Sequence, residues 1–140
     1  MITLLSIHTV APGREEEYVA IQQRLAALTR EHEPHVIRYE HYRGTKPGQF
    51  VSFLTFPDLD AFLAHQIADY HDDVNWEGLF IEHEMQWLDP LPGANDLAQS
   101  EIPPLPDDLD PKKRIYAEMM PPARPAWWGG IAGTSEGAGA

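Results

Sequence analysis

The chain has 140 residues, which is long enough for one domain with a hydrophobic core. Its 22 Asp and Glu residues outnumber 10 Lys and Arg residues, and the resulting net charge of -12 disfavours binding to nucleic-acid phosphates or anionic membranes. There is no cysteine, which excludes disulfides and thiolate nucleophiles, and no apolar run approaches the ~18 residues of a membrane span. We therefore expect a cytoplasmic protein that binds neither nucleic acid nor membrane.

The chain begins with a predicted strand and a predicted helix. Residues 2–10, ITLLSIHTV, are rich in β-branched and apolar residues, and a Pro-Gly pair ends the run. Residues 14–31 then carry apolar side chains at three- and four-residue spacing, which is the helical period. Three glutamates open this segment, where the helix dipole is positive, and Pro34 ends it.

Two strands, a second helix and a last strand follow. The segments HVIRYEHYR (35–43) and FVSFLTF (50–56) predict strands joined by a hairpin at GTKPGQ. Asp58 suits the N-cap of the next helix, and IEHEMQWL (81–88) alternates as a strand does. The order is βαββαβ, so we predict an α+β fold of the ferredoxin-like class with a four-stranded antiparallel sheet.

The first and third predicted strands are apolar on both faces. In the first strand, for example, Ile2 and Leu4 point to one face while Leu5 and Ile7 point to the other. Two helices can cover only one face of a four-stranded sheet, so the second face needs another cover. We therefore predict a homodimer in which two sheets pack face to face.

Residues 89–140 differ in composition from residues 1–88. Nine of the 13 prolines and six of the 10 glycines fall in this part. We predict a domain over 1–88 and a Pro/Gly-rich C-terminal arm over 89–140. Large side chains in the arm favour docking, over its own domain or across the dimer; these are Ile115, Tyr116, Trp127 and Trp128. The final stretch, GGIAGTSEGAGA, is expected to be a tail.

Four features of residues 2–88 together resemble a known family. They are the opening strand leading into APGREEEYVAIQQRLAAL, the stretch VIRYEHYR, the stretch GQFVSFLTFPDLDAFLAH, and a histidine six residues after His65. The pattern is similar to the antibiotic biosynthesis monooxygenase family of dimeric α+β barrels. The resemblance implies an oxygenase for phenols, anthrones or quinols that uses neither metal nor flavin, or a haem-degrading oxygenase, or a protein of other activity. Haem degraders of this family carry asparagine and tryptophan about where Ser6 and His65 stand here, which disfavours haem degradation.

Oxygenation without a cofactor requires a base near neutral pH, donors for an oxyanion and a dry aromatic slot. Histidine is the natural base. In the stretch FLAHQIADYHDDVNW (62–76), His65 lies on the apolar side of the predicted helix. We expect His65 to be the base and His71 a second proton-transfer or binding group. The expected substrate-binding residues are Ser6 and His8 on the first strand, either Arg38 or Tyr39 as oxyanion donor, and Phe53, Tyr70 and Trp76 as slot walls.

Three functions remain open from the sequence. The first is a cofactor-independent monooxygenase with an aromatic, polyketide-like substrate and dioxygen as partners. The second is a cyclase or isomerase that uses the same pocket, and the third is a non-catalytic dimeric protein that binds a small molecule.

No metal site is expected, because the pair His32 and His35 lacks the helical spacing of zinc-binding histidines and Pro34 separates them. Each candidate residue also has a purely structural interpretation as a packing or hydrogen-bonded core residue.

Overall fold

The computed structural model describes residues 1–131. Its elements in chain order are β1 (Ile2–Val10), α1 (Glu15–His32), β2 (Arg38–Arg43), β3 (Gln49–Phe56), α2 (Leu59–Gln66), a 3-10 turn (Asp69–His71), β4 (Phe80–Leu88), α3 (Pro111–Met119) and a second 3-10 turn (Ala126–Trp128). Within the described part of the chain, no helix is both long and apolar enough to cross a membrane.

The four strands form one sheet in the order β2-β3-β1-β4, and each pair of neighbours is antiparallel. β1 and β3 therefore occupy the centre, which explains why their sequences are apolar on both faces. The observed βαββαβ order and antiparallel sheet confirm the predicted α+β, ferredoxin-like fold.

Local chemistry fixes the helix ends. Asp58 caps α2, since its Oδ1 accepts a hydrogen bond from the N–H of Ala61 at 2.8 Å. α1 ends at His32, and the next residue, Glu33, has a φ of -130° and a ψ of 63°, which lie outside the helical region. Pro34 causes this ending, because a residue before proline is disfavoured in the α conformation. The turn buries the Glu33 side chain, which is only 8% exposed.

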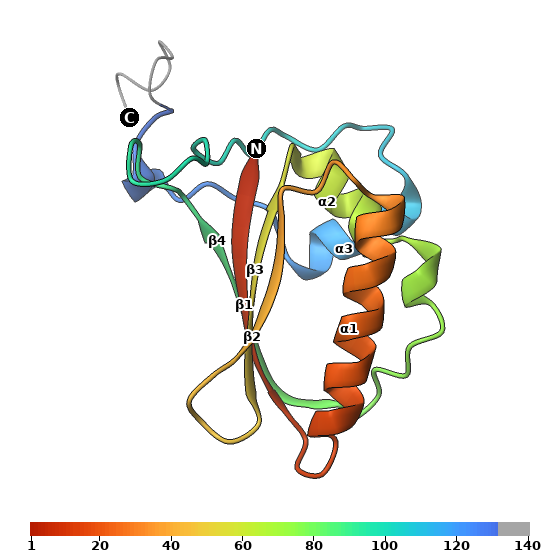
Figure 1. Cartoon of the computed structure of the whole chain (residues 1–140). Coiled ribbons are helices and arrows are strands. Elements are labelled where there is room, and N and C mark those ends of the chain that lie inside the picture. The colour runs from red at the N-terminus through yellow and green to blue at the C-terminus, as the bar shows by residue number, and fades with distance from the viewer. Residues whose placement is uncertain (132–140) are drawn as a thin grey trace.

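The core lies between the sheet and the helices. All three α-helices lie on one side of the sheet (Figure 1). The side chains of Ile2, Leu4 and Phe56 face them and pack against Phe62 and Leu63 of α2, all of them at most 1% exposed. The opposite face carries the second apolar set, which includes Leu5, Ile7, Val51 and Phe53. These four side chains are half-buried within one chain.

Residues 89–131 form an arm that docks on its own domain. It crosses the end of β1, where Glu101 N–H bonds to the Met1 carbonyl at 2.9 Å and Ser100 Oγ accepts from Thr3 N–H at 3.2 Å (Figure 1). α3 then packs against α2, and an ion pair between Arg124 and Asp89 at 3.2 Å ties the arm back to the end of β4.

The predicted anchors of the arm were only partly right. Tyr116 packs against the core, and Trp128 lies against the Arg124 guanidinium at 5.2 Å. Ile115 and Trp127, however, are 57% and 85% exposed, so neither anchors the arm to this chain. The residues that do so are smaller or aliphatic, and they are Ile102, Leu105, Leu109, Ala117 and Met120. The predicted small-residue tail lies, from residue 132 onward, outside the described residues.

Candidate active site

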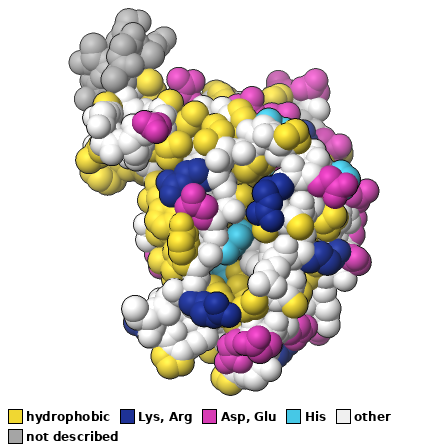
Figure 2. All heavy atoms as spheres, in the orientation of Figure 1, with side chains coloured by type: hydrophobic (Ala, Val, Ile, Leu, Met, Phe, Trp, Pro, Cys, Tyr) yellow, Lys and Arg dark blue, Asp and Glu magenta, His cyan; other side chains and the backbone are white. Residues whose placement is uncertain are grey.

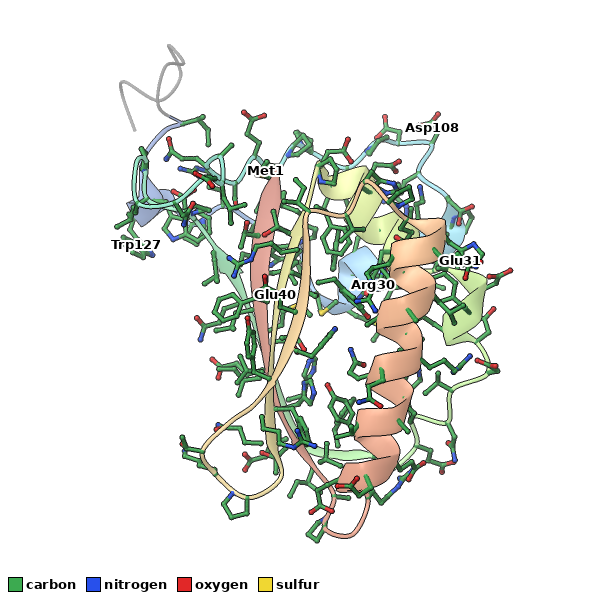
Figure 3. All side chains as sticks on the ribbon, in the orientation of Figure 1. Met1, Arg30, Glu31, Glu40, Asp108 and Trp127 are labelled. Carbon is green, nitrogen blue, oxygen red and sulfur yellow. The ribbon has the colours of Figure 1, made fainter. Side chains whose placement is uncertain are left out.

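A cavity of about 410 Å³ lies between the helix-covered face of the sheet and the three α-helices. Five of the seven histidines of the chain line it, and they are His8, His41, His65, His71 and His83. Figure 2 shows a histidine at the bottom of a hollow in the molecular face, and Figure 3 shows side chains of the sheet and of α1 pointing toward one another across this space. Concave pockets that hold titratable groups with shifted pKa values are typical of functional sites, so this cavity is the candidate active site.

One of these lining histidines, His65, belongs to a buried histidine–carboxylate pair. His65 Nδ1 lies 3.0 Å from Glu33 Oε2, and the two residues are 3% and 8% exposed. Because a carboxylate can only accept, the His65 Nδ1–H donates to Glu33, and in the neutral form of this imidazole the lone pair lies on Nε2. Glu33 comes from the end of α1 and His65 from the last turn of α2. The pair therefore fixes both the tautomer and the orientation of an imidazole that can act as a base.

Aromatic rings surround this base. The His65 ring lies 5.1 Å from Tyr39, 4.9 Å from His71 and 5.3 Å from Phe56, measured between centroids. His71 Nδ1–H donates to the Ala68 carbonyl at 3.2 Å, so its Nε2 is also an acceptor. Burial and the neighbouring His65 lower the pKa of His71, which is therefore neutral at pH 7. Burial raises the pKa of Tyr39 to about 12, so its hydroxyl stays protonated as a donor.

A second polar group lies on β1 and β4. The Tyr18 hydroxyl lies 2.6 Å from His8 Nε2, while Ser6 Oγ lies 3.2 Å from both His8 Nδ1 and His83 Nε2. Burial and the nearby His83 and His41 lower the pKa of His8 to about 4, and burial raises the pKa of Tyr18. A single chain of hydrogen bonds satisfies all four residues. The Tyr18 hydroxyl donates to His8 Nε2, His8 Nδ1–H donates to Ser6 Oγ, and the Ser6 hydroxyl donates to His83 Nε2.

A third group continues across the sheet to β2. His41 Nδ1 lies 2.7 Å from Ser52 Oγ, and the Gln22 amide nitrogen lies 2.9 Å from the His41 ring. Burial, helped by His65, lowers the pKa of His41 to about 4. His8, His41 and His71 are therefore hydrogen-bonded, neutral imidazoles at pH 7 and do not form a cluster of positive charges.

The structure brings together most of the residues predicted for the site. His65, His71, Ser6, His8, Tyr39 and Trp76 all line the cavity. Their catalytic and binding roles remain proposals, since geometry alone assigns none. Of the two residues considered as oxyanion donors, Tyr39 is the one that faces the helices.

Three of the expected positions lie elsewhere. Arg38 and Phe53 lie on the other face of the sheet, where the guanidinium sits 5.3 Å from the Phe53 ring and pairs with Glu40. Alternation along β2 turns Tyr39 and His41 inward and Arg38 outward, and Phe53 of β3 points outward as well, so of the alternatives Arg38 and Tyr39 it is Tyr39 that lines this cavity. Tyr70 does not line the cavity either, since its ring stacks at 5.8 Å on His32 at the end of α1.

Several cavity residues were not predicted. Glu33, the partner of His65, was not among the predicted site residues, and their contact joins positions 32 apart that no local pattern connects. The unpredicted polar residues of the strands and α1 are Tyr18, Gln22, His41, Ser52 and His83, and the arm adds Tyr116, Met119 and Met120. Two of them could have been found from the strand register. Ser52 lies opposite the predicted site residue Ser6, and His41 lies opposite Ser52, so all three side chains share one face of the sheet.

Solved structures share this fold. A Caulobacter crescentus protein assigned to the antibiotic biosynthesis monooxygenases matches with a TM-score of 0.59 and 21% identity, over 64% of this chain and 89% of its own. Proteins with the same assignment from Bacteriodes thetaiotaomicron and Nitrosomonas europaea match with TM-scores of 0.60 and 0.55, at 19% and 18% identity. They cover 67% and 65% of this chain and 93% and 99% of their own. At such identities the likeness shows the shared fold.

About a third of this chain lies outside the shared fold, which is close to the length of the C-terminal arm. Among curated proteins, none matches the chain significantly. The family model described as antibiotic biosynthesis monooxygenase matches residues 1–75, which include β1 to β3, both α1 and α2, and the His65–Glu33 pair. The chain therefore belongs to the antibiotic biosynthesis monooxygenase family.

Proposed function

We propose that this protein is a monooxygenase that oxidises an aromatic phenol, anthrone or quinol with dioxygen, without a metal or an organic cofactor. One observation carries the proposal, namely the buried His65–Glu33 pair on the wall of a cavity of about 410 Å³. Pockets for small molecules hold roughly 300 to 1,000 Å³, so a fused aromatic substrate fits this cavity.

The first step is a proton transfer. The Nε2 atom of His65 takes the proton of an acidic substrate O–H or C–H bond, and Glu33 stabilises the imidazolium that forms. The substrate anion then passes one electron to dioxygen, and the resulting radical and superoxide combine in a new C–O bond. Cleavage of the O–O bond leaves one oxygen on the substrate carbon and releases the other as water. The substrate supplies all four electrons, so no external reductant is needed.

Other cavity residues support the same chemistry. The Tyr39 hydroxyl remains a donor at neutral pH and can stabilise the substrate oxyanion near His65. His71 is neutral and in ring contact with His65, which suits a second proton acceptor. Tyr116 and Met120 of the arm line the cavity on the side of α3, and their bulk helps to limit the entry of water.

Oxygen uptake by the purified protein tests the proposal. A panel of anthrones, naphthols and hydroquinones should include at least one compound that consumes dioxygen, and a chelator should leave the rate unchanged. His65→Ala should lower kcat by roughly 10²- to 10⁴-fold, which is typical for loss of a general base. His32→Ala is the matched control, because His32 lies outside the cavity at the exposed end of α1. Equal rates for wild type and His65→Ala would contradict the assignment of the base.

The same base without dioxygen would make a cyclase or an isomerase. That reaction would exchange the acidic substrate hydrogen with D₂O and consume no oxygen. Binding of aromatic compounds with neither exchange nor oxygen uptake would instead identify a non-catalytic binding protein.

A further inference from the structure

The candidate active site reaches the surface on two sides of the domain. A groove of about 380 Å³ between α1 and β2 shares Tyr18, Gln22, Tyr39 and His41 with the cavity. A hollow of about 340 Å³ beside α3 shares His83, Met85, Met119 and Met120 with it. A molecule longer than the cavity itself can therefore extend toward either opening.

The opening between α1 and β2 is basic. Arg30 and Arg43 line it, and no Asp or Glu does, although the chain carries 22 acids against 10 bases. Within residues 1–131, neither arginine forms an ion pair, whereas Arg24 of the same helix pairs with Asp73 at 2.7 Å. Figure 3 labels Arg30 between α1 and the sheet, and Figure 2 shows Lys and Arg side chains around the hollow that ends at a histidine. Two guanidinium groups without counterions create a local positive field on an otherwise acidic protein.

The opening beside α3 has the opposite character. Met85 and Trp87 of β4 face Met119 and Met120 of the arm there, and Met119 is 69% exposed. Thioethers are polarisable and adapt to the edges and faces of aromatic rings. This opening therefore suits the apolar end of a ligand.

We propose that the substrate is an elongated aromatic carboxylic acid that lies across the domain. Its carboxylate lies in the positive field that Arg30 and Arg43 create at the opening between α1 and β2. Its apolar end contacts Met119 and Met120, and its reactive hydroxyl lies between the two ends near His65. The reactive position rests on the proposed function, whereas the two ends rest on the charge and polarity of the openings. Arginine suits this role because its planar guanidinium binds a carboxylate through two hydrogen bonds.

The test compares two ligands of the same shape. 3-Hydroxy-4-phenylbenzoate carries its carboxylate at one end, a phenyl ring at the other and its hydroxyl between them, and its primary amide lacks only the charge. Calorimetric titration of the full chain at low salt should show the acid binding roughly tenfold more tightly than the amide. In the Arg30→Gln/Arg43→Gln variant this preference should fall below about twofold, because the ligand carboxylate then has no guanidinium to pair with at this opening. Arg24→Gln is the matched control on the same helix and should keep the preference.

Equal binding of acid and amide by the wild type would overturn the proposal, as would a preference that survives the double substitution. Met120→Ala tests the other end, and it should weaken acid and amide by the same factor. If Met120→Ala changed the acid-to-amide ratio, the carboxylate would lie at the opening beside α3, which contradicts the proposed orientation.

The outcome does not depend on turnover. Oxygen uptake with neutral hydroquinones but no preference for the acid would refute the substrate class and leave the monooxygenase proposal intact. A preference that requires Arg30 and Arg43, together with no oxygen uptake from any compound, would support the binding site and refute the oxidation.

Discussion

The Nδ1 atom of His65 lies 3.0 Å from Oε2 of Glu33, across the junction between the last turn of α2 and the end of α1. Each partner depends on the other, because a buried carboxylate without a hydrogen-bond donor is costly and an imidazole without an orienting acceptor can adopt either tautomer. The contact thus couples the packing of two helices to the protonation state of the proposed base.

Glu33→Gln should therefore impair catalysis through His65 rather than through substrate binding. The amide is close to the carboxylate in shape but cannot stabilise the imidazolium, so kcat should fall by at least roughly 10²-fold while KM changes little. The acid limb of the pH–rate profile of kcat should also move to lower pH, because the His65 imidazolium loses its anionic partner and releases its proton more readily. Glu31→Gln, at an exposed position on the same helix, is the control. An unchanged profile for Glu33→Gln would assign the pair a structural role only.

Much of the fold could be predicted because its signals are local. The alternation of residues 2–10, the helical period after Pro12 and the Asp58 cap each depend on a few neighbouring residues, and the structure contains the corresponding β1, α1 and α2. The site was harder to predict because tertiary contacts decide it. Arg38 and Tyr39 are adjacent, and only the packing of β2 determines which of them faces the helices.

Phe53 and Glu33 illustrate the same limit. β3 is apolar on both faces, so its pattern does not distinguish Phe53, on the open face, from Leu54, in the cavity wall. Glu33 resembles an ordinary acid at a helix end until α2 folds over it. The arm contributes Tyr116, Met119 and Met120 to the cavity. This contribution was not predictable, because the periodicity of the arm's sequence does not show which part of the domain it contacts.

The buried histidines should make stability depend on pH. Burial lowers the pKa of His8 in the folded protein to about 4 from its ordinary value of 6.5, so the unfolded chain binds the proton first as pH falls. The contribution of neutral His8 to stability is complete above pH 6.5 and is lost as pH falls toward 4. In this window the free energy of unfolding should fall by on the order of 1.4 kcal/mol per pH unit. Urea unfolding between pH 4.5 and 7.5 measures the slope. His8→Asn should make it shallower, whereas the exposed His32→Asn should leave it unchanged, and equal slopes for all three proteins would contradict the shift.

Truncation after Asp89 should destabilise the domain and promote its association. It removes Tyr116 and Ala117 from the core surface and exposes the apolar face of α2. Loss of one large buried side chain costs about 1.5 to 3 kcal/mol, so the free energy of unfolding should fall by at least that amount. Trp127→Ala in the full chain is the control, because this side chain is 85% exposed and should change stability by less than about 0.5 kcal/mol. Unchanged thermal stability and solubility of the truncated chain would show that the arm contributes nothing to the fold.

The open face of the sheet should be the interface of a homodimer. Leu5, Ile7, Val51 and Phe53 lie on it, and none of the three α-helices covers them (Figure 1). A stable interface buries on the order of 1,200 to 2,000 Å² in total, and its apolar centre tolerates no unpaired charge. Ile7→Glu should therefore convert the dimer to monomers in sedimentation experiments at micromolar concentration. Ile115→Glu, at an exposed position of the arm, should leave the dimer intact and controls for the added charge. A wild-type protein that sediments as a monomer would refute the prediction, since the apolar face would then be exposed to solvent.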